Sequence, residues 1–284
     1  MEVIEDPDSM TSWSRSVRRG GDTVGFVPTM GALHDGHRSL VTESTRRCGA
    51  TVVSIFVNPT QFDERTDFEN YPTTLGADLD MCRVAGVDAV YLPSVEVMYP
   101  PGSSTTVDPG PIGAVLEGRH RPGHFTGVAT VVVKLLGAVR PDIAYFGQKD
   151  FQQVAVLRRV VTDLDLGIRI VALPTVREPD GLAMSSRNTR LDPESRTAAT
   201  VIHRALLAAA KSFHDRRDTP ADVVGVIEHT LATEPSCRTD YVALVDPGTL
   251  APWTGEGPVV ALVAARFGDV RLIDNMVLSD WNGD

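Results

Sequence analysis

Residues 51–57 form an apolar run in which β-branched side chains predominate. A strand with one face in water alternates apolar and polar side chains, whereas a strand buried on both faces reads as a nearly continuous apolar run. Strands of the second kind belong to parallel sheets that helices cover on both faces. This segment therefore favours an α/β fold built on a parallel sheet.

Strand-like and helix-like segments alternate over roughly the first 175 residues. Further strands are predicted at 23–27, 87–92, 142–146 and 168–173. Helices are predicted to begin near Arg38, Thr74, Thr126 and Phe151, with Thr126 as an N-cap. Alternation at this spacing implies right-handed βαβ units and a Rossmann-like, doubly wound parallel sheet.

The pattern changes after Asn188. Asp192 begins a long Ala-rich helix that is expected to reach about Phe213, and Thr219 begins another helix. Three strand-like runs follow, at 241–245, 259–265 and 270–273. Helices followed by strands predict a smaller α+β domain. We therefore expect two domains, 1–175 and 176–284.

Charge and cysteine content narrow the class of protein. The 284 residues include 27 Lys and Arg against 37 Asp and Glu, a formal net charge of −10. A general nucleic-acid binder needs a basic face, so nucleic acid is not an expected partner. Three scattered cysteines suggest no disulfide framework and fit a reducing cytoplasm. No signal peptide or membrane-spanning run is recognised, so we expect a cytoplasmic protein with no membrane partner.

Residues 28–37 lie where the predicted strand at 23–27 meets a helix. The start of a helix offers backbone N–H groups and a positive dipole end, so this turn is expected to bind phosphate. His34 and His37 share one face of the first helical turn, and Gly36 is expected to let a ligand approach the backbone. Two alternatives remain: a zinc site, which needs further ligands, and helix capping without chemistry.

Polar residues follow other predicted strands, and ligands bind at the carboxyl ends of strands in such sheets. Gln61 has an amide that suits a small polar substrate, and Gln153 lies near the same edge. Either residue could equally be a solvated surface glutamine. Lys149 after Gly147 offers a charge for phosphate, although a lone lysine is commonly only solvated. Residues 184–187 offer two hydroxyls and a guanidinium for phosphates, or a Ser-rich hinge.

Two charged groups are harder to assign from the sequence. Arg119, His120, Arg121 and His124 form a basic cluster that either lines a site for an acidic substrate or lies on a surface loop. Asp78, together with Asp80, could hold Mg²⁺ directly or through water. A solvated helix face is the favoured interpretation of these two carboxylates.

Seven segments occur in an order that resembles the pantoate–β-alanine ligase (pantothenate synthetase) family over nearly the whole chain. The first contains an HxGH signature, which alone indicates only a superfamily shared with nucleotidylyltransferases and class I aminoacyl-tRNA synthetases. Asp35 and Gln148 stand where that family more often has Glu. The segments are 28–37, 58–62, 67–72, 116–118 with 121–125, 146–153, 184–188 and 271–275.

The resemblance implies an active site with assigned roles. His37 is the expected proton donor, His34 and Lys149 are catalytic partners, and Gln61 and Gln153 bind substrate. Mg²⁺ is expected to accompany ATP, and Asp78 is a candidate ligand for it. No tightly bound organic cofactor is expected. A homodimer is also implied. The expected ATP-binding residues are Met30, Gly31, Ala32, Leu33, His34, Asp35, Gly36, His37, Gly147, Gln148, Lys149, Asp150, Val176, Met184, Ser185, Ser186 and Arg187.

The implied reaction has two steps. The carboxylate of (R)-pantoate attacks the α-phosphorus of ATP, giving pantoyl adenylate and pyrophosphate, and the amine of β-alanine then gives pantothenate and AMP. The adenylate hydrolyses readily, so the second domain is expected to act as a lid. One alternative is an adenylyltransferase that moves AMP onto a phosphorylated substrate. Another is a non-catalytic ATP-sensing protein.

Overall fold

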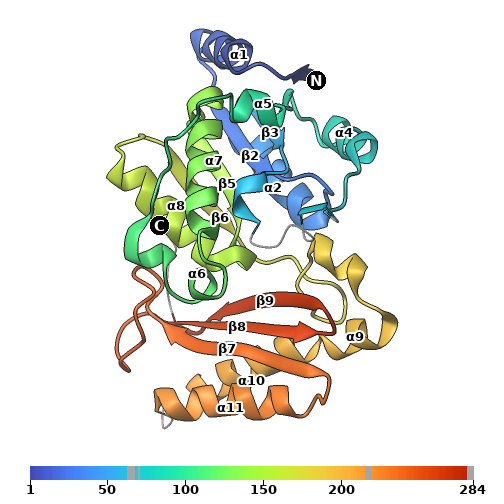
Figure 1. The fold of residues 1–284 in the computed structure, drawn as a ribbon, viewed down its shortest axis with the longest axis vertical. Helices are drawn as coiled ribbons and strands as arrows, with labels where there is room; N and C mark the ends of the chain where they lie inside the picture. Colours follow the sequence, from blue (N-terminus) through green and yellow to red (C-terminus); the bar gives the residue numbers. More distant parts are fainter. Residues whose placement is uncertain (63–67, 70, 215–218, 280–284) are drawn as a thin grey trace. The chain divides into compact units, whose positions relative to one another are not determined.

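The computed structural model describes residues 1–62, 68–69, 71–214 and 219–279 (Figure 1). The chain divides into two compact units: Met1–Gln148 with Gln152–Leu173, and Lys149–Phe151 with Pro174–Asp284. Each unit has its own sheet and its own buried apolar residues.

Within the described residues, the first unit contains a six-stranded sheet in the order β1-β4-β3-β2-β5-β6. Every pairing in it is parallel, and all six residues of β3 are buried. The doubly wound parallel sheet predicted from the sequence is therefore confirmed. The strands are β1 (Glu2–Ile4), β2 (Val24–Thr29), β3 (Ala50–Ile55), β4 (Ala89–Tyr91), β5 (Ile143–Gly147) and β6 (Arg169–Leu173).

Alternate residues along the strands belong to two apolar clusters, one on each face of the sheet. Phe26 and Val52 pack with residues of α1, α7 and α8, whereas Val27 and Val53 pack with residues of α2 and α4. Helices therefore cover both faces. The helices are α1 (Pro7–Arg19), α2 (Asp35–Arg47), α4 (Leu75–Val84), α5 (Val95–Met98), α6 (Glu117–His120), α7 (His124–Val139) and α8 (Phe151–Asp163).

The strand order reverses between β2 and β5. From β2 the chain proceeds to β3 and β4 on one side, whereas β5 and β6 lie on the other side. Ligands of open α/β sheets bind at such a switch point, beyond the carboxyl ends of the strands. In this sheet those ends are Thr29 of β2 and Gly147 of β5.

The second unit combines helices with an antiparallel sheet, in agreement with the predicted α+β composition. Among its described residues the sheet has three strands in the order β7-β8-β9, and its core joins side chains of α10 and α11 to all three strands. The helices are α9 (Pro193–Ala198), α10 (Val201–His214) and α11 (Pro220–Ala232); the strands are β7 (Cys237–Val245), β8 (Val260–Phe267) and β9 (Val270–Val277).

Two helix predictions were wrong in detail. The long helix expected between Asp192 and Phe213 is split into α9 and α10, with Thr200 at the break donating its hydroxyl to the Thr197 carbonyl. Such side-chain bonds to the backbone compete with helix propagation. Thr126 does not cap α7, because that helix already begins at His124 after Gly123, whose φ is 82°.

No helix in the described part of the chain has both the length and the apolar character needed to cross a bilayer.

Candidate active site

The turn after β2 is held by a buried carboxylate. Gly31 and Ala32 adopt left-handed backbone angles, with φ of 83° and 49°. The N–H groups of Ala32 and Leu33 donate to the two oxygens of Asp78, each at 2.9 Å, and the Thr74 hydroxyl donates to the same carboxylate at 3.0 Å. Asp78 is only 3% exposed. The turn is therefore shaped around a protein anion.

His34 and His37 cap α2 through their Nδ1 atoms. The Gly36 N–H donates to His34 Nδ1 at 3.1 Å, and the His34 N–H donates to His37 Nδ1 at 3.3 Å. A neutral imidazole whose Nδ1 accepts a hydrogen bond carries its proton on Nε2. Both rings, whose centroids are 4.2 Å apart, are therefore assigned as Nε2–H donors.

These contacts correct one expectation about the turn. The backbone N–H groups of residues 31–34 and of Gly36 all have acceptors within the protein, so they are not free for phosphate. A Cβ on Gly36 would lie 2.8 Å from the His34 ring. Glycine is therefore required there to accommodate the His34 cap, and the expected approach of a ligand to the backbone of Gly36 stays a prediction. The side chains that the turn can present to an anion include the pair of imidazoles.

Gln61 is fixed through both its side chain and its backbone. Its Oε1 accepts from Asn58 Nδ2 at 2.9 Å, and its Nε2 contacts Met30 Sδ at 3.2 Å. Its carbonyl oxygen accepts from His124 Nδ1 at 2.7 Å and from Arg121 Nη2 at 3.2 Å. Gln61 is therefore not a solvated loop residue, and its amide has a defined direction.

The basic cluster of the sequence separates into two kinds of residue. Arg121 and His124 are partly buried and hold the carbonyl of Gln61, whereas Arg119 and His120 are exposed. No pattern in the sequence signals this division, because the contact joins residues about 60 positions apart in the chain.

Two adjacent glutamines on α8 have different environments. Gln152 is buried, accepts from the Glu117 N–H at 3.0 Å, and donates to the carbonyls of Ile112 and Val115. Its hydrogen bonds hold the segment before α6. Gln153 is partly exposed, so of this pair it is the one available for a substrate.

In the second unit, strand β9 contacts the segment that carries Lys149. Asn275 Nδ2 donates to the Lys149 carbonyl at 2.9 Å, and the Asn275 N–H donates to Asp274. Asp274 is 3% exposed and forms a bidentate pair with Arg177, with N–O distances of 2.6 and 3.0 Å. Arg177 directly follows Val176, so one strand contacts both predicted nucleotide-binding segments of this unit.

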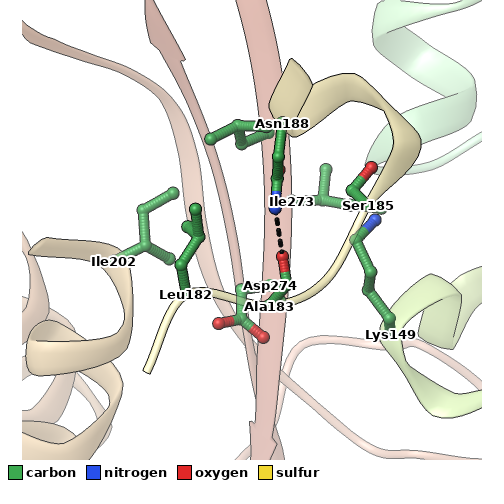
Figure 2. Close-up of a pocket in the computed structure, with 9 residues that line it drawn as sticks. Lys149, Leu182, Ala183, Ser185, Asn188, Ile202, Ile273 and Asp274 are labelled. Carbon is green, nitrogen blue, oxygen red and sulfur yellow. Dashed lines mark hydrogen bonds between the residues drawn. The ribbon is translucent and has the colours of Figure 1, made fainter. Parts of the chain in front are cut away.

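A small pocket lies beside this pair, and Figure 2 shows its lining. The Lys149 side chain is 17% exposed there. Asn188 Nδ2 donates to the Ala183 carbonyl at 3.0 Å, whereas its Oδ1 is buried and has no hydrogen-bond partner among the described residues. Ser185 caps the short helix η4 (Ser186–Arg190), and the Met184 N–H donates to the Val176 carbonyl. The lining residues are Lys149, Leu182, Ala183, Ser185, Asn188, Ile202, Leu272, Ile273 and Asp274.

The carboxylate of Asp78 does not fit an Mg²⁺ ligand, because both oxygens accept hydrogen bonds from the turn and the residue is buried. The favoured interpretation, a solvated helix face, is also wrong for Asp78 but correct for Asp80, whose side chain is 75% exposed. Across the described ranges, no group of three or more His, Cys, Asp or Glu residues could hold a metal ion. The zinc alternative for the two histidines therefore has no further ligands there.

Part of one motif lies outside the described residues, namely Asp67 and Asn70. Phe68 and Tyr71 of the same motif pack edge-on against Phe62, with ring centroids 5.4 and 5.8 Å away.

The sequence profile of the family described as Pantoate-beta-alanine ligase matches residues 2–277. The chain belongs to this family. Pantothenate synthetase 1 of Bradyrhizobium diazoefficiens is 50% identical over 284 residues, 99% of each chain. Pantothenate synthetase of Chloroflexus aurantiacus is 51% identical over 266 residues, 93% of this chain and 95% of the relative.

Solved structures of the family have the same fold. The crystal structure of pantothenate synthetase from Thermus thermophilus matches with a TM-score of 0.92 at 44% identity, covering 99% of this chain and 100% of that one. The pantoate-beta-alanine ligase of Francisella tularensis, in complex with beta-gamma ATP and beta-alanine, matches with a TM-score of 0.80 at 33% identity, covering 98% of each.

The predicted site residues of this family member fall in both units. Those of the first unit gather at the carboxyl ends of β2, β3 and β5 and at the start of α8; those of the second lie in the Lys149 segment and in residues 176–187. The first group comprises Met30, Gly31, Ala32, Leu33, His34, Asp35, Gly36, His37, Gln61, Gly147, Gln148 and Gln153, and the second Lys149, Asp150, Val176, Met184, Ser185, Ser186 and Arg187.

Proposed function

We propose that this protein condenses (R)-pantoate with β-alanine, using ATP, to give pantothenate, AMP and pyrophosphate through a pantoyl adenylate. The observation that carries the proposal is the pair of imidazoles after β2, at the switch point of the sheet, each with its Nδ1 occupied by a backbone N–H. Family membership over residues 2–277 supports the same reaction.

In the first step the carboxylate of pantoate attacks the α-phosphorus, the bond to the bridging oxygen breaks, and pyrophosphate leaves. A carboxylate needs no base, so the protein contributes position and stabilisation of charge. The proposed donors are the Nε2–H groups of His34 and His37, aided by the ammonium group of Lys149. Because both rings are held at Nδ1, little reorientation is needed when charge develops.

In the second step the amine of β-alanine attacks the adenylate carbonyl, and AMP leaves. We assign Gln61 to contact both acids and Gln153 to hold pantoate. The support for Gln61 is its fixed amide, which Asn58 and Met30 hold from the side chain and Arg121 and His124 from the backbone. An amide directed in this way can discriminate a substrate hydroxyl or carboxylate from an apolar group.

Mg²⁺ is proposed only as the companion of ATP, where a divalent ion neutralises phosphate charge. We assign no step to Mg²⁺ bound at Asp78, because both oxygens of that carboxylate already accept hydrogen bonds from the turn after β2. The boundaries 1–175 for ATP and pantoate binding and 176–284 for a lid also stay predictions, as do the homodimer and the cytoplasmic location. Sedimentation of the purified chain tests the dimer.

The deciding experiment is mass detection of pantothenate from ATP, pantoate and β-alanine, combined with ATP–pyrophosphate exchange. The proposal expects exchange that needs pantoate but not β-alanine, and amide formation only when β-alanine is added. Exchange that requires a phosphorylated acceptor would favour an adenylyltransferase. Binding of ATP without turnover of any small acid would favour an ATP sensor.

A further inference from the structure

Asp78 and the turn after β2 form an anion site that the protein fills itself. Successive backbone N–H groups of a tight turn can point towards one acceptor, a geometry that binds anions. Here Gly31 and Ala32 are left-handed, and the acceptor is the Asp78 carboxylate. Both of its oxygens are used, and Thr74 supplies a third hydrogen bond.

Ala32 makes this arrangement informative. A left-handed conformation is unfavourable for an alanine because Cβ approaches the carbonyl oxygen, whereas glycine adopts it freely. Ala32 therefore needs interactions that hold it at φ 49°. Hydrogen bonds to an ionised carboxylate are stronger than neutral ones, and those from Ala32 and Leu33 go to Asp78.

The turn leads directly to the catalytic pair. Leu33 precedes His34, whose N–H donates to His37 Nδ1 and whose own Nδ1 accepts from Gly36. A change in the backbone at Leu33 would therefore change the direction of the His34 N–H. Because that N–H donates to His37 Nδ1, the position of the His37 ring would change as well.

We propose that Asp78 is a positioning residue that sets the direction of both imidazoles, and that it is not a ligand for Mg²⁺. The proposal rests on the proposed function for its kinetic consequence. Its structural consequence, the Nε2–H state of both rings, does not depend on that function.

The test compares Asp78→Asn with Asp80→Asn. Asparagine keeps one acceptor oxygen but presents an amide donor to the second backbone N–H, so the turn loses at least one bond. Asp80 lies on the same helix with its side chain exposed, and it forms an ion pair with Arg83. We expect Asp78→Asn to lower kcat for pantoate-dependent exchange at least tenfold at saturating substrates. Asp80→Asn should stay within about twofold of wild type.

Three further readouts separate positioning from metal binding and from general destabilisation. The Mg²⁺ concentration for half-maximal activity should stay within about twofold in Asp78→Asn. Nitrogen-15 spectra of the imidazoles should show two Nε2–H rings in the wild type that change in Asp78→Asn but not in Asp80→Asn. Adding Ala32→Gly to Asp78→Asn should recover at least threefold in kcat, because glycine adopts the left-handed conformation without the cost that it has for alanine.

If Asp78→Asn fails to fold, Thr74→Val removes one bond to the carboxylate and should cause a smaller loss of kcat in the same direction. A raised Mg²⁺ requirement, with kcat restored at high Mg²⁺, would overturn the proposal in favour of a metal ligand. Wild-type kcat and unchanged imidazole spectra would also overturn it. If the wild-type protein makes no pantothenate, the proposed function fails, and the imidazole spectra still decide the role of Asp78.

Discussion

Removing the charge of Asp274 should make local opening easier in the two predicted nucleotide-binding segments of the second unit, the Lys149 segment and residues 176–187. Asp274→Asn leaves the Arg177 guanidinium without its bidentate carboxylate at a site where the Asp274 side chain is 3% exposed. Breaking a fully buried ion pair costs about 3–5 kcal/mol, and an exposed pair contributes at most about 1 kcal/mol. Because the Arg177 side chain is 21% exposed, we expect a cost of about 2 kcal/mol in local opening.

Hydrogen–deuterium exchange measures this cost directly. A loss of about 2 kcal/mol corresponds to exchange that is roughly 30-fold faster, and it should be confined to peptides covering 149–151, 176–183 and 270–277. The KM for ATP should rise several-fold. Asp240→Asn is the matched control, since it breaks a partly buried pair with Arg271 on the same sheet. Unchanged exchange in 176–183, or equal effects in both variants, would show that the Arg177–Asp274 pair does not hold these segments.

Three other changes test separate parts of the structure. Gln61→Ala should raise the KM for pantoate at least tenfold with little change in thermal stability; an unchanged KM removes the assigned contact. Asn275→Ala deletes the bond to the Lys149 carbonyl but leaves the Arg177–Asp274 pair in place, so it should lower kcat about threefold or more; wild-type kinetics would show that this bond does not position Lys149. Burial, followed by the charge of Arg177, lowers the pKa of His203 below 6.5, against an opposing effect of Asp274. Because the pKa of His203 is lower in the folded than in the unfolded state, this residue contributes to the free energy of unfolding above pH 6.5. That contribution is lost as the pH falls through the folded-state pKa. Thermal melting of His203→Gln from about pH 7.5 to about pH 5 should therefore depend less on pH than wild type, and equal slopes would contradict this.

The fold was accessible from the sequence where burial alone dictates the pattern. Residues 51–57 predicted a strand covered on both faces, and β3 is buried along its whole length. The strand β1 was not predicted, because three residues in an acidic segment carry no usable periodicity. The break at Thr200 was also missed, since it depends on hydroxyl bonds to carbonyls within an otherwise helix-favouring run.

In the candidate site, the sequence predicted the residues that follow strand ends or belong to a motif, but not the residues that contact them. His34, His37 and Gln61 lie at the carboxyl edge that the strand pattern indicated. The partners that hold them could not be predicted, because Asp78 contacts residues 45 and 46 positions earlier and His124 contacts Gln61 across 63 positions. Residue type alone left Asp78 as a residue of a solvated helix face or a metal ligand, and only the tertiary contacts show a carboxylate that accepts hydrogen bonds from the backbone.

Two Nδ1-anchored imidazoles are proposed to stabilise the transfer of AMP to pantoate. Rapid-quench measurement of pantoyl adenylate in wild type, His34→Ala and His37→Ala tests this proposal most directly. We expect adenylate formation in the wild type before β-alanine is added, and a loss of at least tenfold in each variant, equivalent to about 1.4 kcal/mol of barrier. Near-normal adenylate formation in both variants would contradict it.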